Sequence, residues 1–299
     1  MANRVTQGMM NIQLLRNLNN NMVRLERLQD QMSTGRRINK PSDDPVGISF
    51  SMRYRSELSV NSQYQRNVDS ATSWLSYTDK MMDQAGQVLQ RARELAVQGA
   101  NGTNSEQSLK SMKSEMEQLY EQMVSIGNSK FNGKYVFNGE RTEQIPFPDS
   151  KDAMNAVTDP GEIKFEIGLG VRMAVNKTAD QVFGKPGESD NVFQVLQDLV
   201  NSLESQDQTA IGKGIEGIDL RMNKFLEQRA DIGAKTNRIE LAEDRLKDVD
   251  LNLQSLQSKT EDADLAKVIT SLKMDENVYQ ASLSAGAKLI RPSLLDFLR

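Results

Sequence analysis

Apolar residues near the start of the chain recur every three or four positions, which is the spacing of one face of an α-helix. The residues that share this stripe are Leu15, Leu18, Met22, Leu25 and Met32. Leu14 and Leu28 form a second stripe beside the first. Because the two stripes together are wider than the contact surface of one partner helix, we expect this helix to meet more than one neighbour.

The C-terminal region carries a matching stripe, interrupted by Glu276 and Gly286. Its apolar members are Ile269, Leu272, Tyr279, Leu283 and Ile290. The same periodicity runs through 60–97 and 239–256. These patterns predict long helices that pack through apolar faces, and they leave both ends of the chain in need of a partner.

The seven prolines divide the chain. No proline occurs in 46–145 or in 187–291, whereas four prolines fall between 146 and 186. Because proline breaks the interior of a helix, two long helical stretches are predicted on either side of a short irregular middle.

The middle of the chain changes from helical to strand periodicity. Between 163 and 175, apolar residues alternate with polar or small ones, and Gly168 and Gly170 allow the chain to turn back. This pattern predicts a β-hairpin within a small β-rich insert. A second hairpin is predicted over 131–139, where an aromatic segment lies between two Asn-Gly pairs. We expect the insert to tolerate shortening while the helices stay folded.

Capping signals predict where the first long helix ends and the second begins. Gly35 suits a helix C-terminus, because glycine adopts a positive φ without steric cost. Asp44 followed by Pro45 predicts the next helix start, with the carboxylate accepting a free backbone amide. The adjacent Asp43 and Asp44 are therefore interpreted as turn and cap residues rather than as a metal or acid-base pair.

Near the C-terminus, Ser258 with Glu261 predicts a further helix start after a joint near Leu256. Glu261, Asp262 and Asp264 would then lie in the first turn of a helix, where acidic side chains complement the helix dipole. They lack the ligand spacing of a calcium loop.

The composition limits the kinds of catalytic and binding site that the chain can form. The chain contains neither Cys nor His, which removes thiol and imidazole catalysis and the usual zinc sites. A net charge of −4 with both signs dispersed indicates no nucleic-acid binding. No apolar run approaches a membrane span, and the opening residues lack the apolar region of a cleaved signal peptide. We therefore expect a structural protein with no catalytic site, cofactor, metal or membrane contact.

Several segments resemble the bacterial flagellin family. The most specific is STGRRINKPSDDP over 33–45, which resembles the N-terminal signature of that family. LQRARELAVQGANGTNSEQ over 89–107, FNG at 131–133 and TEDAD at 260–264 are similar to further segments of the family. The resemblance assigns to the signature loop the residues Gly35, Arg37, Ile38, Asn39, Asp43, Asp44 and Pro45.

The resemblance covers roughly 1–140 and 190–299 and implies a fold: a mostly α-helical, elongated rod of long helices, whose N- and C-terminal helices pair as a coiled coil, with a small β-rich central insert. The expected parts are terminal assembly arms at 1–40 and 261–299, a helical rod at 41–140 and 190–260, and an outer insert at 141–189.

The arms are expected to be largely disordered until assembly, when neighbouring subunits cover the second stripe of Leu14 and Leu28. The assembly interface would consist of the residues of both stripes on the N-terminal arm, the C-terminal stripe, and the apolar residues Leu294, Leu295 and Phe297.

Three segments set the chain apart from filament flagellins: the opening RVTQGMM, GKYVFNGERT over 133–142 and the ending RPSLLDFLR. They favour a family member that joins the hook to the filament. The resemblance then implies contact with hook-associated protein 1, with flagellin and with further copies of the chain in a ring. It also implies an extracellular position in the flagellum, reached by type III export without a cleaved signal and with a chaperone on the C-terminal arm. The alternatives are a short filament flagellin and, outside the family, a cytoplasmic coiled-coil scaffold.

Arg91 and Leu95 lie in a segment through which flagellins contact an innate immune receptor. The facing helix over 107–126 matches the family poorly. The resemblance therefore gives only weak support for receptor recognition, and ordinary packing within the rod is the alternative.

Overall fold

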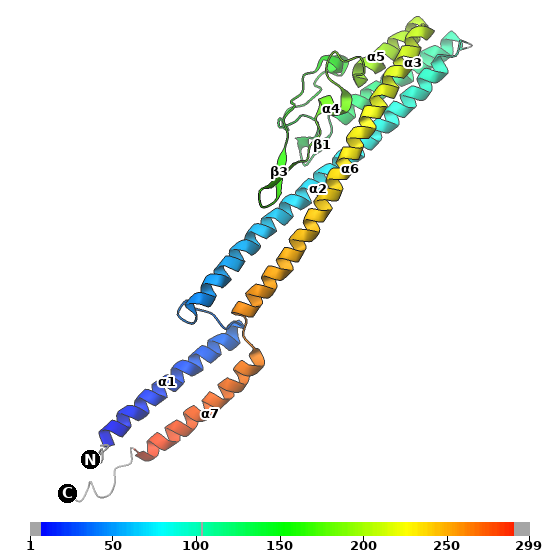
Figure 1. The fold of residues 1–299 in the computed structure, drawn as a ribbon. Coiled ribbons are helices and arrows are strands. Elements are labelled where there is room, and N and C mark those ends of the chain that lie inside the picture. Colours follow the sequence, from blue (N-terminus) through cyan, green and yellow to red (C-terminus); the bar gives the residue numbers. More distant parts are fainter. Residues whose placement is uncertain (1–6, 103, 290–299) are drawn as a thin grey trace, which may run out of the picture. The chain divides into compact units, whose positions relative to one another are not determined.

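The computed structural model describes residues 7–102 and 104–289. It confirms the mostly α-helical class, since the described residues contain only two sheets, each a pair of antiparallel strands (Figure 1). In chain order the elements are α1 (Gln7–Thr34), α2 (Pro45–Gly99), α3 (Glu106–Gly127), β1 (Lys130–Phe131), β2 (Lys134–Tyr135), the 3-10 helix η1 (Ser150–Asn155), β3 (Lys164–Gly168), β4 (Val171–Ala174), α4 (Ala179–Phe183), α5 (Val192–Ser205), α6 (Gln208–Glu261) and α7 (Leu265–Leu289).

The chain forms two compact units. The terminal unit consists of residues 1–60 and 249–299, and the central unit consists of residues 61–248. The long helices α2 and α6 contribute residues to both units.

The central unit has one continuous apolar core, built from α2, α3, α5, α6 and the segments around the strands. Aromatic rings gather around Phe193 of α5, whose centroid lies 4.7 Å from that of Phe147 and 5.6 Å from that of Phe183. On the outside of the core, the Arg229 guanidinium of α6 donates to the carboxylates of Asp79 and Asp83 of α2, each at 3.0 Å. Within this unit, α2 and α6 are therefore held together by polar as well as apolar contacts.

Both predicted hairpins are present. In the first, β1 pairs with β2 through a turn at Asn132 and Gly133, both of which have positive φ, the conformation that Asn-Gly favours in tight hairpins. In the second, β3 pairs with β4 through a turn in which Gly170 has a φ of 70°. The tip residue of this turn, Leu169, is 89% exposed.

The insert shares the core of the helices. Phe147 and Phe183, which flank its strands, belong to the same buried cluster as the helical residues. The buried Lys177 ammonium also reaches α6, where it donates to the Asp231 carboxylate at 2.6 Å. These contacts leave the hairpin tip as the part of the insert that can be shortened at least cost to the core.

The predicted joint near Leu256 is wrong. Helix α6 continues to Glu261, and the Thr260 hydroxyl donates to the Leu256 carbonyl within the same helix. Ser258, the predicted cap, therefore lies inside α6, and Glu261 ends that helix rather than lying in the first turn of the next one. The chain turns after Glu261, and α7 begins with the Asp264 carboxylate accepting from the Lys267 amide at 3.1 Å.

Candidate assembly interface

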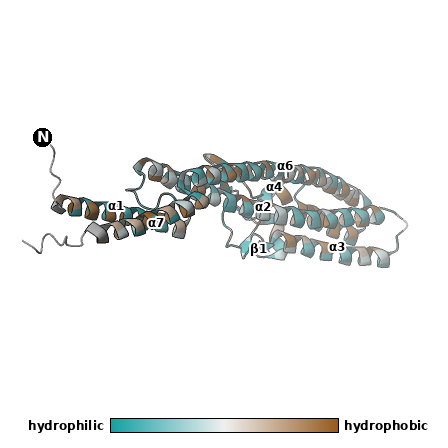
Figure 2. Ribbon diagram, turned by 90° about the horizontal axis from the view of Figure 1, so that it is seen from below, coloured by the Kyte–Doolittle hydropathy of each residue, from teal (hydrophilic) through white to brown (hydrophobic). Residues whose placement is uncertain are grey.

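Within the terminal unit, α1 and α7 lie side by side and antiparallel, each with apolar and polar residues along its length (Figures 1 and 2). The residues turned inward follow the regular three- and four-residue spacing of a two-helix seam. From α1 they are Asn11, Leu14, Leu18, Asn21, Leu25 and Leu28, and from α7 they are Val268, Leu272, Asp275, Tyr279, Ser282 and Gly286. We call these residues the arm seam.

The arm seam divides the first of the two stripes on α1. Leu18 and Leu25 of that stripe face α7 together with Leu14 and Leu28 of the second stripe, whereas Leu15, Met22 and Met32 are exposed. The reason is that a polar residue, Asn21, takes the seam position that the apolar pattern assigns to Met22. Asn21 is 7% exposed and accepts a hydrogen bond from Arg24 at 2.6 Å. An asparagine within a two-helix seam is an established way to fix helix register, and apolar periodicity alone does not detect it.

The C-terminal stripe divides in the same way. Leu272 is buried and Tyr279 is half-buried in the arm seam, but Ile269 and Leu283 are exposed. Val268, one turn before Leu272, is buried and was missed because Ile269 is the more apolar of the two neighbours. The candidates Ile290, Leu294, Leu295 and Phe297 lie outside the described residues.

Two contacts fix the antiparallel pair. The Arg24 guanidinium of α1 lies 3.4 Å from the Asp275 carboxylate of α7. Further along, a Cβ atom at Gly286 would lie 2.7 Å from Leu14, so the absence of a side chain allows the two helices to approach closely. Beside this contact, an apolar groove of about 460 Å³ is lined by residues of both helices, among them Leu15 and Leu283.

The signature loop connects α1 to α2 and is bonded to the start of α7. Gly35 ends α1 with a φ of 70°, and its carbonyl accepts from the Ala263 amide at 2.9 Å. The Arg37 amide donates to the Glu261 carbonyl at 2.7 Å, so the two chain segments form a short antiparallel bridge between Arg36 and Asp262. The bridge joins the two arms at the point where each meets its long helix.

The paired aspartates are turn and cap residues, as predicted. The Asp43 carboxylate accepts from the amides of Lys40 and Asn39 at 2.9 and 3.1 Å, and these bonds lower the pKa of Asp43. The Asp44 carboxylate accepts from the Gly47 amide at 2.9 Å, which lowers the pKa of Asp44. Pro45 opens α2 directly after this cap.

Ile38 and Arg37 connect this loop to the helices. Ile38 is 2% exposed and lies against Gly47, where a Cβ would clash with it. The Arg37 guanidinium donates to the Thr260 carbonyl at 2.8 Å and lies 3.4 Å from the Asp44 carboxylate. The loop is therefore packed and hydrogen-bonded at both ends.

Sequence reasoning missed the main role of Glu261. Its carboxylate is 1% exposed and lies 3.6 Å from the Arg36 guanidinium, with Arg55 of α2 in contact with the same oxygen. Gln257 donates to the other oxygen at 2.9 Å. Arg55 and Glu261 are far apart in sequence, so no local motif indicates this pair. We call Glu261, Arg36 and Arg55 the joint cluster.

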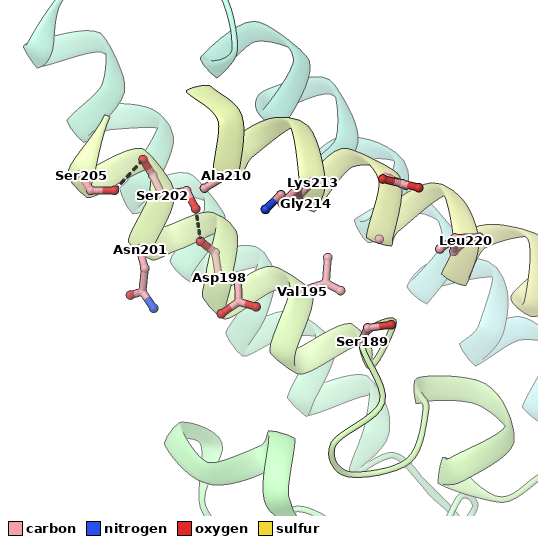
Figure 3. A pocket seen from close by; sticks show the side chains of 12 residues that line it. Ser189, Val195, Asp198, Asn201, Ser202, Ser205, Ala210, Lys213, Gly214 and Leu220 are labelled. Atoms are coloured by element: carbon pink, nitrogen blue, oxygen red, sulfur yellow. Dashed lines mark hydrogen bonds between the residues drawn. The ribbon is translucent and has the colours of Figure 1, made fainter. Parts of the chain in front are cut away.

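Two other candidate regions lie in the central unit. Leu95 is buried in its core, and the half-exposed Arg91 pairs with Glu94 and Glu115. A pocket of about 570 Å³ lies beside α5 and the start of α6, and Figure 3 shows the side chains that line it. Its hydroxyls at Ser202 and Ser205 donate to carbonyl oxygens of their own helix, so they are not held for attack on a substrate.

None of the described helices has an apolar stretch long enough to span a bilayer. No group of three or more acidic side chains is arranged to hold a metal ion within the same residues.

Comparisons with known proteins match both ends of the chain. The model of the bacterial flagellin N-terminal helical region matches residues 5–142, and that of the C-terminal helical region matches residues 215–298. The chain is 28% identical to flagellar hook-associated protein 3 of Escherichia coli strain K12 over 94% of this chain and 95% of that protein. It is also 28% identical to a flagellar filament core protein of Treponema maltophilum over 85% of each. A solved structure of a putative flagellar hook-associated protein from Vibrio parahaemolyticus shares the fold, with a TM-score of 0.68 and 23% identity over 74% of this chain and 100% of that one.

Proposed function

The chain belongs to the bacterial flagellin family, and from this premise we propose that it is a structural adaptor of the flagellum, equivalent to hook-associated protein 3, that joins the hook to the flagellin filament. In this role it contacts hook-associated protein 1 on the hook side, flagellin on the filament side and copies of itself in a ring. It performs no catalysis. Similarity to hook-associated protein 3 over nearly the whole chain supports this role.

The main observation that supports the proposal is the apolar surface of the arms. Leu15 and Met22 each follow a residue of the arm seam by one position, so they lie about 100° further round α1 and border the seam. Ile269 and Leu283 are exposed on α7. An apolar surface along a helix pair with few buried residues fits a structure that is completed by neighbouring chains.

Assembly would then be coupled to ordering of the arms at 1–40 and 261–299, while 41–140 with 190–260 forms the rod and 141–189 the outer part. Disordered arms suit passage through the flagellar export channel and binding of a chaperone to the C-terminal arm. Brief trypsin digestion of the purified monomer should leave a resistant fragment that begins near Arg36 or Lys40 and ends before Lys267. Full-length protein that survives digestion, with arm amides protected from hydrogen exchange, would contradict coupled folding.

A gene deletion tests the adaptor role. Cells without the protein should build hooks and release flagellin monomers into the medium, because filament growth has no starting surface. Attached filaments of normal length in those cells would overturn the proposal.

Two matched substitutions separate assembly from folding. Leu15→Asp places a charge on the exposed face beside the arm seam and should prevent contact with neighbouring subunits. Leu18→Asp places the charge in the arm seam and should prevent the α1–α7 pair from forming on assembly, because an unpaired charge is costly to bury. Both monomers should keep the helicity of the rod by circular dichroism, and immunolabelling of flagella should show that neither is incorporated. Incorporation of the Leu15→Asp protein at the wild-type level would show that this face is not an interface.

Similarity to a filament core protein favours one other function, that of a short filament flagellin. Under this alternative, purified protein seeded on filament fragments should extend them without limit. The adaptor should instead stop after forming a limited layer on hooks.

A further inference from the structure

The methionines of this chain divide between its two units. The chain contains 15 methionines, and all except Met1 lie among the described residues with assigned burial. In the terminal unit every one of these is exposed: Met9, Met10, Met22, Met32, Met52 and Met274. In the central unit every one is buried or half-buried: Met81, Met82, Met112, Met116, Met123, Met154, Met173 and Met222. Solvent therefore reaches methionine sulfur far more readily in one unit than in the other.

We infer that the exposed methionines of the terminal unit are oxidation sites for peroxide-class oxidants and that their oxidation prevents the unassembled chain from being incorporated. In this reaction a lone pair of the thioether sulfur attacks one peroxide oxygen, and the O–O bond breaks. The sulfur is oxidised by two electrons to the sulfoxide, and hydrogen peroxide is reduced to water. No metal or cofactor is required.

The loss of incorporation follows from the position of the sulfur atoms. Met22 borders the arm seam on α1, on the side that carries exposed Leu15, and Met274 is 62% exposed on α7. A sulfoxide is polar and chiral, so burial of this group against a neighbouring subunit leaves its oxygen without a hydrogen-bond partner. This step rests on the proposed function, because it requires that assembly cover these residues.

The central unit provides an internal control for chemical access. Met82, Met116 and Met123 are fully buried within its core. A peroxide molecule reaches their sulfur atoms only when the core opens. Their reaction rate in the folded protein should therefore report unfolding rather than surface chemistry.

Hydrogen peroxide treatment of the purified full-length protein, followed by peptide mass spectrometry, tests the sites. We expect sulfoxide at the exposed methionines of the terminal unit while Met82, Met116 and Met123 remain unmodified. The same treatment in urea should modify all of them. Equal rates for the two groups in the folded protein would overturn the inference.

An incorporation assay on hooks from cells that lack the gene tests the consequence. Peroxide-treated protein should bind these hooks about tenfold less than untreated protein, a change that corresponds to about 1.4 kcal/mol. Reduction by methionine sulfoxide reductases of both stereospecificities should restore binding. A variant with all six exposed methionines changed to leucine should bind before and after peroxide, and the variant with Met81→Leu and Met222→Leu should stay sensitive.

Two outcomes would count against the consequence: unchanged binding of oxidised wild-type protein, or equal loss by the sixfold leucine variant. If that variant loses helicity, the M22L/M274L double variant replaces it and should show partial resistance. Failure of the untreated protein to bind hooks would count against the proposed function instead. Peptide mass spectrometry would still identify which methionines are oxidised.

Discussion

In the central unit, buried apolar residues from α2, α3, α5 and α6 form one cluster, whereas in the described part of the terminal unit only Ile38, Val268 and Leu272 are buried apolar residues. Both units carry the same helical periodicity of apolar positions. The difference lies in how many neighbours each apolar face finds within the chain. Periodicity thus identifies a face that needs cover, but only the fold shows whether the chain itself covers it.

The largest expected effect separates the two units by stability. Phe193→Ala removes a ring from the centre of the aromatic cluster and should lower the free energy of unfolding of the central unit by about 3–5 kcal/mol. The matched change Phe50→Ala removes an exposed ring of the terminal unit. It should alter the free energy of unfolding of the central unit by no more than about 0.5 kcal/mol. Urea unfolding followed through Trp74, the single tryptophan, reports the central unit. Similar losses in both variants would show that the units share one core.

A smaller effect concerns the joint cluster. Glu261→Gln removes the buried negative charge between Arg36 and Arg55 and should destabilise the terminal unit by about 1–3 kcal/mol. Amide exchange should accelerate at the end of α6 and in the signature loop, while unfolding measured through Trp74 stays unchanged. Glu57→Gln, which disrupts only an exposed pair with Arg53, is the matched control. Unaltered exchange in the Glu261→Gln protein would mean that backbone hydrogen bonds alone hold the signature loop against the segment between α6 and α7.

The smallest effect is a dependence on pH at the signature loop. Folding lowers the pKa of Asp43 and of Asp44 below the usual value of 3.8. Their carboxylates therefore stabilise the loop fully above that value, and the contribution is lost as the pH falls through the lower pKa of the folded state. Amide exchange in the loop should accelerate below pH 3.8 before the Trp74 signal changes. The Asp44→Asn protein should show a weaker dependence, and an identical profile would remove Asp44 as its source.

Much of the local structure could be predicted from sequence. The Asn-Gly turn of the β1–β2 hairpin, the positive φ of Gly35 and the cap formed by Asp44 all depend on residues within a few positions of one another. Such features are determined by backbone sterics and by short-range hydrogen bonds. These features can therefore be predicted before the fold is known.

Features that depend on distant segments could not be predicted in the same way. The choice between Asn21 and Met22 for the arm seam depends on which face of α1 meets α7, and hydrophobicity favours the wrong residue. Likewise, the burial of Glu261 arises from the meeting of α6 with Arg55 of α2. In both cases tertiary packing determines which residue is buried, and the local sequence pattern does not.

The β3–β4 hairpin has a practical consequence for microscopy. Its tip at Leu169 projects into solvent, and no atom lies within 4 Å of where a Cβ would extend from neighbouring Gly170. A short epitope or dye-binding peptide inserted at this turn would leave the aromatic cluster of the central unit undisturbed. Light microscopy of living cells could then follow the arrival and number of these subunits on each growing organelle without altering the surfaces through which they assemble.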